Sequence, residues 1–130
     1  MRPSRSGIGA KRGAALLIAI LAGCASAPGR LAAPRAMFGV QIAPYATVEE
    51  CMSLAPGERV GYRFDARPPV AFSVHFHDGN AVIVPVARDR TTSESGDFSA
   101  DRKQVYCLTW EAGAEGSVVD YRINPWPRPP

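Results

Sequence analysis

Apolar and polar residues alternate with a period of two in three short segments of this chain. The alternation covers residues 60–64, 72–76 and 105–110. Because successive side chains of a strand point to opposite faces, this pattern predicts half-buried strands. The apolar run 81–86 predicts a returning strand, and residues 118–123 predict a closing strand. A short strand is also expected to begin at Phe98.

Turn residues separate these segments. Asp78-Gly79 lies between two apolar runs and predicts a tight hairpin, and residues 112–116 predict a second turn. Pro85 indicates an edge strand or a strand end, since proline cannot donate a ladder hydrogen bond. The polar run 88–97 predicts an exposed loop. With 12 glycines and 12 prolines, the chain is expected to be all-β, an antiparallel β-sandwich of about seven short strands.

The first 23 residues are typical of a lipoprotein signal peptide. Residues 2–12 carry positive charge, residues 14–22 are wholly apolar, and Leu21-Ala22-Gly23-Cys24 resembles the lipobox of bacterial lipoproteins. That resemblance implies cleavage before Cys24 and acylation of its thiol. Ala25 follows where aspartate would signal retention in the inner membrane, so the expected location is the periplasmic face of the outer membrane.

The predicted organisation is a signal peptide (1–23), a lipidated tether (24–45), a sandwich domain (46–124) and a proline-rich tail (125–130). Separating the signal changes the charge. Four of the 15 basic residues and none of the 12 acidic residues lie in 1–23, which leaves the mature chain at −1 rather than +3. This balance argues against a nucleic-acid partner.

The stretch from Cys51 to Ile123 resembles the GOLD (Golgi dynamics) domain, a β-sandwich of cargo receptors that also occurs in bacterial extracytoplasmic proteins. The shared features are a cysteine before a short polar turn (51–58), a strand ending at an Asp-Gly hairpin (74–79), Gly96-Asp97-Phe98, and an aromatic-cysteine strand (106–110). Glu111-Ala112 stands where the family often has asparagine, and the receptors' transmembrane helix and cytoplasmic tail are lacking. The resemblance therefore implies the fold and not the trafficking role.

Two cysteines remain once Cys24 is assigned to lipid. Cys51 and Cys107 form an even pair in an oxidising compartment, where a disulfide is the expected state. The GOLD resemblance implies the same pairing. A redox or nucleophilic thiol is the alternative, but neither cysteine belongs to a Cys-x-x-Cys motif.

His75 and His77 are the two histidines of the chain. Their spacing places both on one face of a strand, opposite the apolar face, so they are expected on the solvent side. Such a pair can hold copper or zinc if further ligands arrive, with Glu94, Asp97 and Asp120 as candidates. The alternative is a pair of exposed polar residues without a ligand.

The aromatic residues have two interpretations each. Tyr106 and Trp110 are expected either to pack in the core or to line a ligand groove. Trp126 is expected either to dock on a partner or to cover the end of the sandwich.

The preferred hypothesis is a membrane-anchored, non-enzymatic lipoprotein that binds an envelope protein or ligand. The alternative is a periplasmic copper- or zinc-binding protein that uses His75 and His77.

Overall fold

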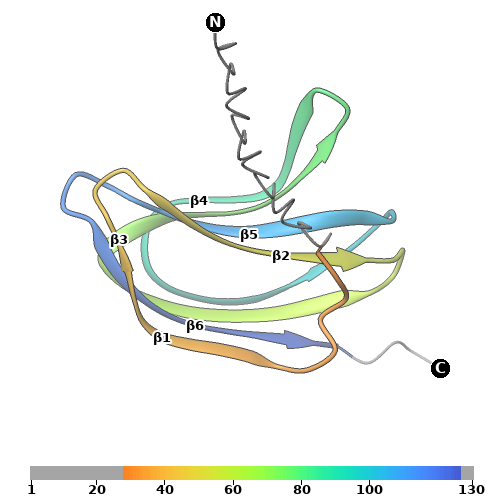
Figure 1. Cartoon of the computed structure of the whole chain (residues 1–130), viewed down its shortest axis with the longest axis horizontal. Helices are drawn as coiled ribbons and strands as arrows, with labels where there is room; N and C mark the ends of the chain where they lie inside the picture. The colour runs from red at the N-terminus through yellow and green to blue at the C-terminus, as the bar shows by residue number, and fades with distance from the viewer. Residues whose placement is uncertain (1–27, 127–130) are drawn as a thin grey trace, which may run out of the picture.

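The computed structural model describes residues 28–126 and shows an all-β domain (Figure 1). Its six strands form one antiparallel sheet, which confirms the predicted fold class. The strands are β1 (Arg35–Ile42), β2 (Thr47–Leu54), β3 (Arg59–Asp78), β4 (Ala81–Ser99), β5 (Gln104–Ala112) and β6 (Ser117–Pro125).

Strand β3 joins two layers of this sheet because it changes partner halfway along. Its first half, from Val60 to Arg67, pairs with β6, and its second half, from Val70 to Phe76, pairs with β5. The Arg67–Pro68 peptide between the halves is cis. Strand β6 carries β1 and β5 carries β2, while β4 follows β3 through both halves. The sheet thus curls into two facing layers, here called the β6 layer and the β5 layer (Figure 1).

The core lies between these layers and is rich in aromatic side chains. Phe72 of the β5 layer lies 4.9 Å, between ring centroids, from both Tyr62 and Phe64 of the β6 layer. Trp110 stacks on Tyr121 at 4.5 Å, again across the two layers. Burying such a side chain contributes about 1.5–3 kcal/mol to stability, so the period-two pattern itself holds the layers together.

The structure differs from the prediction in the number and length of strands. There are six rather than about seven, and two of them are long: β3 has 20 residues and β4 has 19. The expected loop over 88–97 is wrong, because these residues belong to β4. Strand β4 pairs only with β3 and is exposed along most of its length, so its polar residues suit an edge strand as well as a loop.

The predicted turns are confirmed. Strand β3 ends at Asp78 and β4 begins at Ala81, and Gly79 between them has φ of 59°, which glycine adopts readily. The turn over 112–116 links β5 to β6. Pro85 lies on the edge strand β4 near a register shift, as its missing N–H requires.

The predicted tether over 24–45 is wrong for its second part. Strand β1 pairs with β6, so residues 35–42 belong to the domain. Before it, the Ser53 N–H donates to the Gly29 carbonyl, and Arg30 pairs with Glu58. The alanine- and proline-rich composition that favoured a tether hides a strand whose residues are mostly exposed. The signal peptide and Cys24 lie outside the described residues, and within 28–126 no helix has the length and apolarity to cross a membrane.

Candidate functional site

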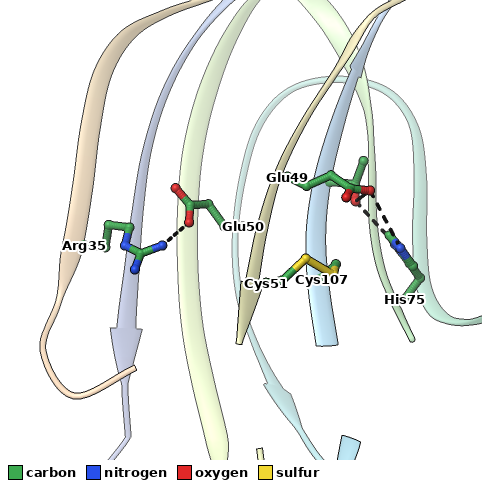
Figure 2. Close-up of a disulfide and its surroundings, with 7 residues drawn as sticks. Arg35, Glu49, Glu50, Cys51, His75 and Cys107 are labelled. Atoms are coloured by element: carbon green, nitrogen blue, oxygen red, sulfur yellow. Dashed lines mark hydrogen bonds and ion pairs between the residues drawn. A yellow bond between two sulfur atoms is a disulfide. The ribbon is translucent and has the colours of Figure 1, made fainter. Parts of the chain in front are cut away.

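The disulfide lies on the outer face of the β5 layer. Cys51 of β2 and Cys107 of β5 are direct register partners, and their sulfurs are bonded (Figure 2). The predicted bond is therefore present. It joins two neighbouring strands of one layer rather than the two layers, which leaves packing and side-chain contacts to hold the layers together.

His75 and His77 share this outer face, as their spacing predicts. His75 is the register partner of Cys107, and its side chain is only 12% exposed, whereas His77 is exposed. The two ring centroids lie 5.5 Å apart in an edge-to-face arrangement. The expectation that both histidines face solvent is thus confirmed for His77 and only partly for His75.

Two residues that the sequence analysis did not single out complete the surroundings of His75. The Thr109 hydroxyl donates to Glu49 Oε1 at 3.2 Å and lies 3.3 Å from His75 Nδ1. Glu49 Oε1 also lies 3.8 Å from His75 Nε2 (Figure 2). Because the hydroxyl has one proton, which goes to Glu49, Nδ1–H of His75 donates to Thr109. Nε2 of His75 then faces the Glu49 carboxylate.

None of the three predicted additional metal ligands reaches the histidines. Glu94 pairs with Arg88, Asp97 pairs with Arg59, and Asp120 accepts the Gly39 N–H at 2.6 Å. Within residues 28–126, the one trio of candidate ligand atoms within 4.8 Å is Glu49, Cys51 and Cys107, whose sulfurs are bonded to each other. A copper or zinc site on His75 and His77 stays a prediction, with Glu49 as its nearest carboxylate.

A cleft opens on the outer face of the β6 layer. It has a volume of about 290 Å³ and is lined by Phe38, Arg63, Phe64, Asp65, Asp120, Tyr121 and Arg122. Phe38 is 72% exposed at a register shift in β1, where Gly39 has φ of 64° and donates its N–H to Asp120. A bulge of this kind redirects a side chain, and here it holds an aromatic ring in solvent beside the cleft.

The charges of this cleft are arranged in like pairs. Arg63 lies opposite Arg122, and Asp65 lies opposite Asp120, on neighbouring strands. Like charges directly opposite each other destabilise a sheet. Within residues 28–126, the guanidinium groups of Arg63 and Arg122 have neither an ion pair nor a hydrogen bond. Two unpaired guanidinium groups beside an exposed ring suit an anionic group attached to an apolar one.

A third polar cluster closes the side of the sandwich where β1 and β2 meet. Glu50 of β2 pairs with Arg35 of β1 (Figure 2) and accepts the Tyr121 hydroxyl of β6 at 2.5 Å. Burial raises the pKa of Tyr121 well above its usual value, and the hydrogen bond to the Glu50 carboxylate raises it further. All three groups have a partner, so we assign this cluster to structure rather than to binding.

The aromatic residues that were candidates for ligand or partner binding lie in two places, the core and the surface. Tyr106 and Trp110 are fully buried and belong to the core, so the groove hypothesis for them is wrong. Trp126 lies over Gly61 with the Arg59 guanidinium 4.8 Å from its ring, and it is 48% exposed. Neither a protein-family model nor a curated protein matches this chain, so the GOLD resemblance rests on the sequence motifs alone.

Proposed function

We propose that this protein is a lipid-anchored, non-enzymatic binding module of the bacterial cell envelope. The observation that carries the proposal is the cleft on the β6 layer. It combines an aromatic ring held in solvent by a bulge with two arginines at opposite register positions, whose guanidinium groups have no partner within residues 28–126. Arginine and aromatic residues dominate the energetics of protein interfaces, which supports a recognition surface.

The charge pattern indicates the chemistry of the partner. Arg63 and Arg122 line the cleft, and the planar guanidinium of each is a fork of donors that suits a carboxylate or a phosphate. Phe38 lines the same cleft and offers an apolar surface. The partner we propose is an envelope protein or ligand that carries an anionic group beside an apolar one.

The anchor is supported by the sequence of residues 1–24. The charged start, the short apolar run and the lipobox-like Leu21-Ala22-Gly23-Cys24 together predict export and acylation. Several acyl chains on one residue hold a protein firmly, because a single chain binds membranes only marginally.

The binding proposal is tested by cross-linking in intact cells followed by recovery of the protein from the envelope. We expect wild type to retain a partner that is lost in Phe38→Ala and in Arg122→Glu. Arg90→Glu is the matched control, since Arg90 is an exposed arginine of β4 that does not line this cleft. A partner recovered equally with all four proteins contradicts the assigned surface.

The anchor is tested separately by palmitate labelling. Label should appear in the wild type and vanish in Cys24→Ser. Label that persists in Cys24→Ser, or wild-type protein that takes up none, contradicts lipidation at Cys24.

A further inference from the structure

Five consecutive apolar residues, Ala81 to Pro85, are exposed at the start of β4. Val82 is 54% exposed, Ile83 41% and Val84 47%. Exposed apolar runs of this length are avoided in soluble domains unless they have a function. They lie on an edge strand, where charged residues commonly prevent association, and here the run contains none. In Figure 1 the β3–β4 hairpin projects beyond the body of the sandwich.

The hairpin lies at the same end of the domain as the first described residues. Phe76 of β3 is the register partner of both Ile83 and Tyr106, and Tyr106 pairs with Met52. Across the sheet, Ile83 therefore lies in the same row as Met52, near the C-terminal end of β2. At that level the Ser53 N–H donates to Gly29. We call this end, formed by residues 28–31, 54–58, 78–84, 100–104 and 125–126, the entry end.

The distance from the entry end to the proposed lipid is short. Cys24 precedes Pro28 by four residues. An extended chain spans at most about 3.6 Å per residue, so the Cα of Cys24 lies within about 14 Å of the Cα of Pro28. This step rests on the proposed function, because it requires that Cys24 is the lipidated residue. A link this short holds the entry end against the bilayer surface.

We infer that the hairpin run Ala81–Pro85 inserts into the interface of the bilayer that holds the anchor. Trp126 lies at the same end and is 48% exposed, and tryptophan is enriched at membrane–water interfaces. The occupant of the exposed run is thus the lipid surface rather than a protein.

The contact is apolar rather than electrostatic. The entry end carries three basic residues (Arg30, Arg102 and Lys103) and three acidic residues (Glu58, Asp78 and Asp101). Arg30 pairs with Glu58, and Arg102 pairs with Asp78 at 3.9 Å. With its charges balanced, this end gains little from anionic headgroups. Binding of the hairpin should therefore be insensitive to salt and should not require anionic lipid.

The test uses the full lipidated protein in vesicles whose acyl chains carry bromine, a short-range quencher of tryptophan fluorescence. Ile83→Trp reports on the hairpin, and Thr92→Trp is the matched control because Thr92 is an exposed residue of the same strand toward its other end. Both are made in a Trp126→Phe background, where the buried Trp110 gives a constant signal. Flotation of the vesicles measures the anchor independently.

We expect both variants to float and only Ile83→Trp to be quenched, by at least twofold more than Thr92→Trp, in neutral and in anionic vesicles and at low and high salt. Flotation with equal quenching overturns the membrane contact and leaves the anchor intact. Flotation with an unquenched Ile83→Trp that cross-links as a dimer overturns it in favour of a second copy. Wild-type protein that does not float overturns the proposed anchor and this inference with it.

Discussion

Tyr121 donates its hydroxyl to Glu50 at 2.5 Å, across the side of the sandwich where the edge strands β1 and β2 face each other. Arg35 pairs with the second carboxylate oxygen of the same residue. The Glu50 carboxylate thus connects β2 of the β5 layer to both β1 and β6 of the β6 layer. Within residues 28–126, strands β1 and β2 do not pair with each other, so this side-chain contact closes a side that the sheet leaves open.

Removing this hydroxyl should destabilise the fold. We expect Tyr121→Phe to lower the free energy of unfolding by about 2 kcal/mol, because it deletes a hydrogen bond to a charged, largely buried acceptor. Urea denaturation measures the change. Tyr45→Phe is the control, since Tyr45 is 74% exposed, and a loss of equal size there would contradict the assignment.

Stability should fall at alkaline pH. Burial raises the pKa of Tyr62, Tyr106 and Tyr121 in the folded protein. Unfolded tyrosine ionises near about pH 10, so the contribution of these residues is complete below that pH and is lost as the pH rises above it. The urea midpoint should decline above about pH 10, less steeply in Tyr121→Phe than in the wild type. A flat profile through this range would contradict the raised pKa values.

The disulfide should contribute strongly to stability. It joins residues 56 positions apart, and the chain-entropy relation gives about 4 kcal/mol for a loop of this length. The double variant Cys51→Ala/Cys107→Ala should lose stability of that order in urea denaturation. In the denatured wild type, thiol reagents should label Cys51 and Cys107 only after reduction, and labelling without reduction would show that the bond is absent.

A larger side chain at Gly96 should lower the stability of the fold. A Cβ at this position would lie 2.7 Å from the Tyr62 hydroxyl oxygen, and Tyr62 is itself buried. Gly96→Ala is expected to cost about 1–3 kcal/mol through this overlap. Gly113→Ala has no atom within 4 Å of the added methyl group and serves as the control. Equal stability of the two variants would mean that the Tyr62 ring moves aside.

The histidine pair is tested by titration with copper and zinc. If it binds a metal, the wild type should bind more tightly than His75→Ala/His77→Ala, and Glu49→Gln should weaken binding because Glu49 is the carboxylate nearest to Nε2. Equal affinity in the wild type and the double variant would dispose of the metal site and leave His75 with its hydrogen bond to Thr109.

The apolar pattern predicted the core well because burial acts on every second residue. Leu108 and Trp110 are buried as their spacing requires, and the hairpin at Gly79 follows from its local backbone demand. Strands β1 and β2 and residues 88–97 of β4 escaped prediction. All three lie at edges of the sheet, and none carries the uninterrupted apolar alternation that marks a half-buried strand.

The environment of His75 could have been found from one further step. An antiparallel pairing of Cys51 with Cys107 places Glu49, two residues earlier, opposite Thr109, two residues later. That register puts both on the disulfide face. The cleft had no such signal, because it depends on a bulge at Gly39 and on the pairing of β3 with β6, which lie far apart in the sequence.

The two-partner arrangement of β3 has a consequence for how the chain folds as it is synthesised. Among neighbouring strands, only β3 and β4 pair with each other, so this hairpin is the one sheet contact that forms locally. Strand β2 can pair only after β5 has been synthesised, and strand β1 can pair only after β6 has been synthesised. The strands that are synthesised first therefore pair last, and the domain cannot complete its sheet until β6 has been synthesised.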